Sequence, residues 1–157
     1  MSAVPSIEVR VQAEPFDQQR ELEQLRGACG DIGALAAFTG ICRDEGGQLK
    51  ALELEHFAGM AEAEIRRIST EAAARFGLAG VVVVHRHGII RPGEDIVLVA
   101  AASAHRDAAF DGARFVMDFL KTRAPFWKKE HPADDRPGAW VSAADKDDQA
   151  LDKWSRG

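Results

Sequence analysis

The sequence predicts an α+β fold in a single domain. Three observations carry this prediction. The chain has 157 residues, which suits one domain. Some segments alternate apolar and polar side chains, as strands do, and others repeat apolar side chains at helical spacing. The predicted elements follow one another in the order β-α-β-β-α-β-β-α-β, with no internal repeat.

The first third of the chain predicts a strand, a helix and a hairpin. Residues 6–12 alternate apolar and polar side chains, which is typical of a half-buried strand. Residues 16–27 contain many helix formers and predict a helix. Residues 33–40 and 49–57 predict two strands joined by the polar turn 43–48, so we expect them to pair as a hairpin.

The middle of the chain predicts a helix followed by two buried strands. Residues 60–77 repeat apolar side chains at helical spacing, and Gly77 is expected to end the helix. Residues 81–88, which begin with four valines, and the apolar run 96–102 predict two strands of the buried type. Residues 89–95 predict a turn between them.

A second long helix is predicted over residues 103–120, with Ser103 as its N-cap. Pro125 prevents the helix from continuing, because proline lacks a backbone N–H and restricts the residue before it. Residues 138–143 predict a last strand.

The predicted domain spans residues 1–157, because no linker or low-complexity segment divides the chain. Its end, residues 144–157, is expected as a polar C-terminal tail. A short helix docked by Trp154 is the ordered form that this tail could take.

Composition and charge exclude several classes of protein. The net charge is −5, so the chain does not bind nucleic acid through its bulk charge, and any anion must be held by a local cluster. Cys29 and Cys42 match neither a disulfide framework nor a metal-ligand spacing, which favours a reducing cytoplasm. The N-terminus shows no secretory signal, and the apolar runs are too short to span a bilayer.

The segment KTRAPFWKKE (residues 121–130) concentrates four cations around a Phe-Trp pair. In one interpretation Lys121 and Arg123 complement the negative end of a helix dipole, while Phe126 and Trp127 cover the core. In the other, the lysines line an apolar pocket. Desolvation and a neighbouring cation would then lower a lysine's pKa and make its amine available as a base or nucleophile.

A second candidate site is SAHR, at the predicted start of the second long helix. Free backbone N–H groups, the positive end of the helix dipole and Arg106 would together bind an anion, with His105 beside them. The alternative is a surface arginine paired with Asp107 or Asp111. Residue chemistry alone leaves both open.

Four other positions have weaker patterns. Arg43 follows a predicted strand and could bind a ligand from a loop, or belong to a plain turn. His85 and His87 should point to the same side of a strand, and without a third ligand a hydrogen-bonded role is favoured over a metal site. Cys42 has no activating neighbour in the sequence and is treated as a small apolar residue.

Five segments occur in order over roughly residues 33–143: FTGICRDEGG, LELEHFAGMAEAEI, HRHGIIRPGE, SAHRDAAFDGARFVMDFLKTRAPFWKKE and AWV. In this order and register they resemble the large, catalytic subunit of molybdopterin synthase. The resemblance implies an α/β hammerhead-type single domain, with a mixed or antiparallel sheet and two main helices.

The resemblance also implies a sulfurtransferase and its partners. Members of the family form a homodimer, and each protomer binds a small ubiquitin-like sulfur-carrier subunit, which gives a heterotetramer. Sulfur passes from the carrier's C-terminal thiocarboxylate to cyclic pyranopterin monophosphate and builds the dithiolene of molybdopterin. This chemistry requires no metal or redox cofactor, and neither a nucleic acid nor a membrane is expected as a partner.

Carried over residue by residue, the resemblance implies Lys121 as the principal catalytic residue and Lys128 as an assisting one. The residues expected to hold the phosphate and pterin, or to contact the substrate beside Lys128, are Arg43, His105, Arg106, Lys129 and Glu130. The chain departs from the family's pattern at Ile41, Cys42 and His87, so these positions receive no role.

Two alternatives remain at this stage. The first is a non-catalytic homologue that keeps the fold and binds the carrier as a scaffold; the presence of both Lys121 and Lys128 argues against it. The second is a lysine enzyme that forms a Schiff base with another phosphorylated carbonyl compound.

Overall fold

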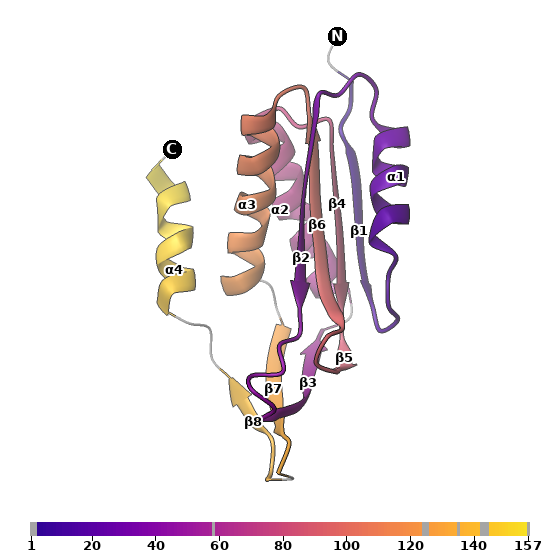
Figure 1. The fold of residues 1–157 in the computed structure, drawn as a ribbon. Coiled ribbons are helices and arrows are strands. Elements are labelled where there is room, and N and C mark those ends of the chain that lie inside the picture. Colours follow the sequence, from indigo (N-terminus) through magenta and orange to yellow (C-terminus); the bar gives the residue numbers. More distant parts are fainter. Residues whose placement is uncertain (1–2, 58, 124–125, 135, 142–144, 157) are drawn as a thin grey trace.

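The computed structural model describes residues 3–57, 59–123, 126–134, 136–141 and 145–156, and it confirms a mixed α+β single domain (Figure 1). The elements in chain order are β1 (Ser6–Gln12), α1 (Gln18–Ala28), β2 (Ala34–Ile41), β3 (Leu49–His56), α2 (Met60–Phe76), β4 (Gly80–Arg86), β5 (Gly88–Ile90), β6 (Asp95–Ser103), α3 (Arg106–Thr122), β7 (Phe126–Pro132), β8 (Ala139–Val141), α4 (Asp145–Asp152) and the 3-10 turn η1 (Lys153–Arg156).

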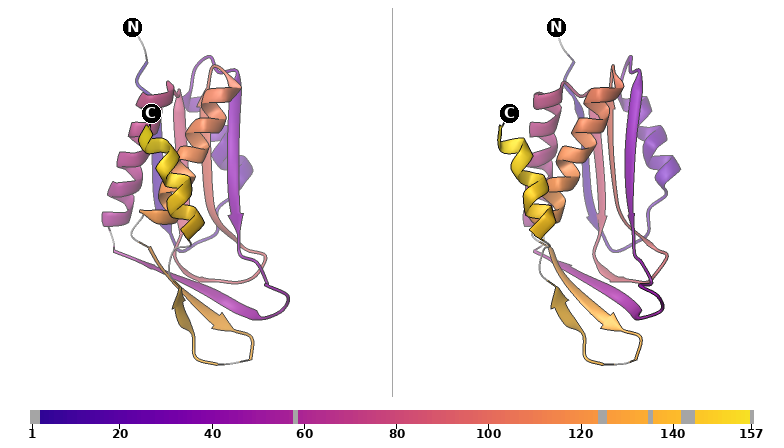
Figure 2. Two further views of the ribbon diagram at one scale, coloured as in Figure 1. Left: turned by 90° about the vertical axis from the view of Figure 1, so that its left-hand side faces the viewer. Right: turned by 60° about the vertical axis from the view of Figure 1, so that its left-hand side comes forward.

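The strands form two four-stranded sheets. The first sheet has the order β1-β4-β6-β2, and the second has the order β5-β3-β7-β8. The β1–β4 pair is parallel and the other pairs are antiparallel. Helix α1 covers one face of the first sheet, α2 and α3 cover the other, and the second sheet lies beyond one end of the first (Figures 1 and 2).

The main core fills the space between the first sheet and helices α2 and α3. Its largest fully buried side chains include Ile65, Ile68, Val81, Val83, Phe115 and Val116. On the other face of the sheet, Val82 and Val84 pack with Leu25 of α1. Strand β4 is therefore buried on both faces, which explains its unbroken run of valines.

The ends of the two long helices agree only in part with the sequence-based expectations. Gly77 ends α2 as predicted, with a left-handed backbone (φ 65°, ψ 44°). The prediction of Ser103 as the N-cap of α3 is wrong: β6 continues through this buried residue, and His105 is the N-cap. The helix ends at Thr122, and Pro125 lies outside the described residues.

The predicted hairpin of residues 33–40 and 49–57 is wrong. Both segments are strands, but β2 pairs with β6 in the first sheet, and β3 pairs with β5 and β7 in the second. The apolar side chains of β3 explain the difference. Leu52 and Leu54 are buried with Cys42 and Ile90 in a separate core between the second sheet and the end of the first.

The sequence analysis did not predict strands β5 and β7, and it did predict strand β8. Residues 89–95 were predicted as a turn, yet Gly88–Ile90 already form β5. The basic segment Phe126–Pro132 was not predicted as a strand, yet it forms β7 in the middle of the second sheet. The predicted last strand is confirmed as β8, and residues 142–143 of that prediction lie outside the described residues.

The C-terminal tail is docked on the helical layer, as the sequence allowed. Trp154 packs edge-to-face on Phe76 and Phe115, with ring centroids 5.6 Å and 5.4 Å away. Its indole N–H donates a hydrogen bond of 2.6 Å to the Asp118 carboxylate. Helix α4 therefore lies against α3 (Figure 2). Within the described ranges, no helix is both long and apolar enough to cross a membrane.

Replacing Gly80 with alanine should destabilise the protein by roughly 1–3 kcal/mol, because the added carbon has no room. A Cβ there would lie 2.6 Å from the Cys29 sulfur and 2.9 Å from Leu25 Cδ1, between α1 and β4. Urea unfolding measures the change. The matched control is Gly27→Ala in α1, where nothing lies within 4 Å; it should stabilise by about 0.5–1 kcal/mol. Equal stabilities of the two variants would contradict this packing.

Candidate active site

Helix α3 carries three of the predicted site residues, at opposite ends. His105 is its N-cap, Arg106 is its first residue and Lys121 lies in its last turn. At 1.5 Å per residue, Arg106 and Lys121 are about 22 Å apart along the helix axis. Figure 1 shows the two ends of α3 at opposite ends of the first sheet. Within one chain, therefore, His105 and Arg106 do not meet Lys121.

The C-terminal end of α3 lies where the two sheets meet. We call this region the junction and define it by His56, His85, His87 and Phe126. The His85 and Phe126 rings are stacked, with centroids 4.0 Å apart and an interplanar angle of 16°. His56 lies 4.4 Å from His87 and 6.0 Å from Phe126, measured between ring centroids. The junction thus joins the end of β4 to strands β3 and β7.

Lys121, Lys128 and Arg43 lie at the same end of the molecule as this junction. The Lys121 side chain is exposed in the single chain, yet its positive charge acts on the His85 ring. The charge of Lys128 acts on the thiol of Cys42, which immediately precedes Arg43. The structure therefore places these three predicted cations at the same end of the molecule.

Lys129 and Glu130 lie on opposite faces of β7, because side chains alternate along a strand. Glu130 pairs with Leu52 and shares the face of Lys128, which is turned toward the first sheet. Lys129 pairs with Glu53 on the outer face, where its ammonium lies 5.6 Å from the centre of the Trp140 ring. Only Glu130 of this pair shares a face with Lys128.

Two of the junction histidines, His85 and His56, are held in their neutral form. Burial, with a smaller contribution from the positive charge of Lys121, lowers the pKa of His85 to about 4, although its hydrogen bond to the Arg86 backbone opposes this. Burial also lowers the pKa of His56, with His87 contributing in the same direction. At neutral pH these rings therefore add no positive charge beside the lysines.

Cys42 is buried and stays protonated. Burial raises the pKa of its thiol, the positive charge of Lys128 opposes this, and Glu45 and Glu94 add to it. The thiol lies 3.8 Å from the carbonyl oxygen of Ile90. This agrees with the interpretation of Cys42 as a small apolar residue and not as a nucleophile.

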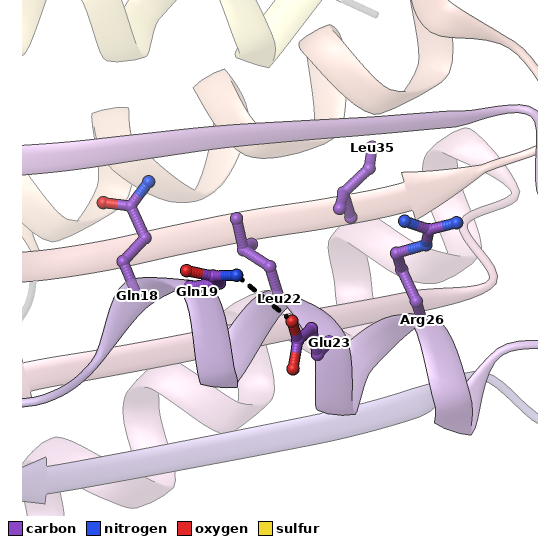
Figure 3. A pocket seen from close by; sticks show the side chains of 6 residues that line it. All are labelled: Gln18, Gln19, Leu22, Glu23, Arg26 and Leu35. Atoms are coloured by element: carbon purple, nitrogen blue, oxygen red, sulfur yellow. Dashed lines mark hydrogen bonds between the residues drawn. The ribbon is translucent and has the colours of Figure 1, made fainter.

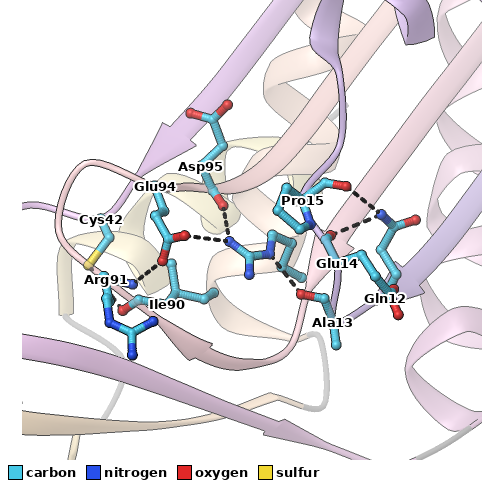
Figure 4. Close-up of polar contacts among 10 residues, drawn as sticks. Gln12, Ala13, Glu14, Pro15, Cys42, Ile90, Arg91, Glu94 and Asp95 are labelled. Atoms are coloured by element: carbon cyan, nitrogen blue, oxygen red, sulfur yellow. Dashed lines mark hydrogen bonds and ion pairs between the residues drawn. The ribbon is translucent and has the colours of Figure 1, made fainter.

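Arg86 is a buried arginine that fixes the end of β4, a role that sequence reasoning did not assign to it. Its guanidinium donates hydrogen bonds to the backbone oxygens of Ala13 (3.0 Å) and Asp95 (3.4 Å), and it lies 3.9 Å from the Glu94 carboxylate (Figure 4). These contacts tie the segments after β1 and before β6 to β4. They hold the adjacent His85 in place.

His85, His87 and His56 are the members of the junction that sequence reasoning did not assign to the site. The expectation that His85 and His87 share one side of a strand is not tested directly, because β4 ends at Arg86, but both rings belong to the same aromatic cluster. His85 is hydrogen-bonded near the sheet end, as favoured over a metal site. In the described part of the chain, no group of three or more potential metal-ligating side chains is arranged to hold a metal ion.

An open groove of about 480 Å³ lies elsewhere, between α1 and β2 (Figure 3). Its lining residues are Gln18, Gln19, Leu22, Glu23, Arg26 and Leu35. Gln19 donates a 3.3 Å hydrogen bond to Glu23 across its floor. The groove is on the face of the first sheet opposite α3, so it is separate from the junction.

Comparison with known proteins gives consistent matches over almost the whole chain. A family model described as "MoaE protein" matches residues 11–123. A curated relative from Rhizobium meliloti (strain 1021), described as "Molybdopterin synthase catalytic subunit", is 61% identical over 150 residues, which cover 96% of this chain and 97% of the relative.

Solved structures of similar proteins share the fold. "Molybdopterin cofactor biosynthesis protein E" from Burkholderia multivorans ATCC 17616 is 46% identical with a TM-score of 0.82, over 96% of this chain and 97% of that chain. The X-ray structure of molybdopterin synthase from Staphylococcus aureus is 27% identical with a TM-score of 0.72, over 84% and 95% of the two chains.

The buried His85 should make stability depend on pH. Its folded pKa of about 4 lies below the unfolded value of 6.5, so the unfolded state binds more protons between these values. The contribution of the neutral ring to the free energy of unfolding is complete above pH 6.5. It falls by about 3 kcal/mol as the pH drops to 4. Urea unfolding between pH 7 and 4 should therefore show a shallower pH dependence for His85→Phe. Identical slopes in the two proteins would contradict the burial of a neutral ring.

Proposed function

This chain belongs to the MoaE protein family, and we propose on that basis that it acts as the sulfur-transferring catalytic subunit of a molybdopterin synthase. It is an enzyme of molybdenum cofactor biosynthesis. The similarity to curated catalytic subunits covers nearly all of both chains, which supports carrying the activity over as a whole. The cation-rich junction supports the same reaction class, because both the sulfur donor and the acceptor are anions.

The partners follow from the same reaction. A small ubiquitin-like carrier would bring its C-terminal thiocarboxylate to the junction, and cyclic pyranopterin monophosphate would accept the sulfur. We propose a homodimer of this chain with one carrier on each protomer, working in the cytoplasm. The two cysteines, Cys29 and Cys42, are free and buried, which suits a reducing compartment.

Lys121 is proposed as the principal catalytic residue and Lys128 as its assistant. A lysine ammonium at this place can donate a proton to the oxygen that leaves the pterin side chain, or stabilise the charge that develops on it. The exposure of Lys121 in the single chain leaves it accessible to an incoming carrier tail. Arg43 and Glu130 would contact the substrate from the same end of the molecule.

The dimer completes the site in this proposal. His105 and Arg106 begin α3, where backbone N–H groups and a guanidinium favour an anion such as the substrate's phosphate. Because they lie about 22 Å from Lys121 along the helix, they can serve the same substrate only from a second copy of the chain. A two-fold axis would create two such shared sites in each dimer.

Lys129 has a different position from the other predicted contacts. Its ammonium lies over Trp140 on the outer face of the second sheet, away from the face of Lys128. This placement favours a contact with a partner chain over a contact with the substrate. The aromatic ring below it would keep the ammonium in place.

A non-catalytic scaffold homologue remains the alternative function. It would bind the carrier with the same surfaces but give no turnover. The position of Lys121, Lys128 and Arg43 at one end of the molecule favours catalysis. Carrier binding without any molybdopterin formation would favour the scaffold.

Lys121→Ala should lower the rate of molybdopterin formation by roughly 100-fold or more, because a positioned acid–base group typically contributes that much. The assay mixes the protein with thiocarboxylated carrier and cyclic pyranopterin monophosphate. The control is Arg114→Ala, which removes an exposed cation from the middle of α3 and should keep the native rate. A native rate for Lys121→Ala would show that the catalytic assignment is wrong.

Two inactive variants should restore activity when they are mixed. If Lys121 and Arg106 serve one site from different copies, a dimer of one Lys121→Ala chain and one Arg106→Ala chain contains one intact site. After subunit exchange of equal amounts, about a quarter of the wild-type activity should return. A mixture that stays inactive, although exchange is shown by mass spectrometry, would contradict the shared site.

A further inference from the structure

Strand β2 forms an outer edge of the first sheet, and its sequence lacks the features that usually protect such an edge. The strand is eight residues long (Ala34–Ile41) and contains no charged side chain. Phe38 is 43% exposed, and Ile41 is also exposed. A long apolar edge offers unpaired backbone N–H and C=O groups to another strand, so proteins usually cover such edges or place charges on them.

The other sheet edges in the described part of the chain are protected. Strand β1, at the opposite edge of the first sheet, carries Glu8 and Arg10. Arg66 of α2 also donates a hydrogen bond of 3.2 Å to the Ile7 carbonyl of β1. Strands β5 and β8, at the edges of the second sheet, have three residues each. Because short or charged edges pair poorly with another chain, β2 is the edge best suited to a partner strand.

The side of helix α3 that is turned toward the β2 edge is apolar as well. Helix α3 lies over β6 and β2, with α2 on its other side (Figure 2). Phe115 of α3 packs edge-to-face on Phe76 of α2, with ring centroids 5.6 Å apart. At about 100° per residue, Phe110 and Met117 lie on nearly the opposite side of the helix from Phe115. Phe110 is 65% exposed and Met117 is half-buried.

Phe38 lies on the face of β2 that is turned toward α3. Side chains alternate along a strand, so Phe38 shares the face of Ala34 and Ala36, which pack in the core under the helices. The open edge of β2 and the uncovered side of α3 therefore adjoin each other. We call the three apolar side chains that line them the edge patch: Phe38, Phe110 and Met117.

The dimensions of β2 and α3 fit a second copy of the same surface. Strand β2 spans about 24 Å at about 3.4 Å per residue, and α3 spans about 24 Å at about 1.5 Å per residue. A two-fold axis through the middle of β2 would pair it antiparallel with β2 of a second copy. The two α3 helices would then run antiparallel on one face of the joined sheet. Their axes would be about two strand spacings, or about 10 Å, apart, which is typical of packed helices.

We propose that a second copy of this chain docks on the β2 edge and the edge patch, pairing β2 with β2 and packing α3 against α3. This inference rests on the dimer of the proposed function and identifies the surface that forms it. Phe110 and Met117 lie at nearly equal distances from the middle of α3, so each faces the other residue in the second copy. The same arrangement brings Arg106 of one copy beside Lys121 of the other, as the shared site requires.

Two lysine substitutions test the surface through the oligomeric state of the chain alone. Phe38→Lys and Phe110→Lys each place two charges in the interface, because a two-fold axis repeats every substitution. Sedimentation equilibrium should show a dimer for the wild type and a dissociation constant raised roughly 100-fold or more for each variant, since a buried ammonium loses its water. The matched control is Trp140→Lys, which replaces an exposed aromatic side chain on β8 and should leave the dimer intact.

Amide hydrogen exchange in the wild-type protein locates the interface without any substitution. In the dimer, amides along the whole of β2 should be protected, because both edges of the strand are then paired. On dilution to the monomer, part of this protection should be lost. Exchange in β1, the opposite edge of the same sheet, should not depend on protein concentration.

The inference would be overturned by a chain that is monomeric without its carrier, or by β2 exchange that does not change with concentration. It would also be overturned if either Phe38→Lys or Phe110→Lys stayed as tightly dimeric as Trp140→Lys. If a lysine variant does not fold, as circular dichroism would show, the exchange experiment decides. A monomeric Phe110→Lys protein that forms molybdopterin at the native rate would support the interface and overturn the shared site of the proposed function instead.

Discussion

The length and direction of helix α3 constrain every functional statement about this protein. The helix runs along the first sheet, with the proposed anion-binding residues His105 and Arg106 at its start and Lys121 in its last turn (Figure 1). A rigid helix cannot bring its own ends together. The proposed site, which uses both ends of α3 for one substrate, therefore requires two copies of the chain.

The junction of the two sheets is the second feature on which the proposed site depends. The stacking of the Phe126 ring on the His85 ring joins strand β7 to the end of β4, and hydrogen bonds from Arg86 connect that end to the neighbouring segments. The proposed catalytic lysines thus stand on packed elements and not on free loops, which favours a fixed geometry. The same packing keeps the His85 ring neutral, so this ring adds no positive charge beside the lysines.

Much of the fold could be predicted from local patterns, because strand alternation, helical spacing and the glycine at position 77 act over a few residues. The partners of β2 and β3 could not be predicted, since an alternating pattern indicates a strand but does not indicate which strand it pairs with. Strand β7 could not be predicted because Phe126–Pro132 consists mostly of basic or acidic residues and shows no strand pattern. Its pairing with β3 on one side and β8 on the other makes it a strand. The junction could not be predicted either, because His56 and His85 meet only through the pairing of β3 with β7.

The central claim, that the two ends of α3 from different copies share one site, is tested most directly by a distance between copies. Spin labels can be placed at Arg106→Cys in one preparation and at Lys121→Cys in another, because the native cysteines are buried. After the two are mixed, pulsed electron paramagnetic resonance should detect a separation clearly shorter than the roughly 22 Å between these positions within one helix. No dipolar coupling, or a longer separation in a confirmed mixed dimer, would contradict the account.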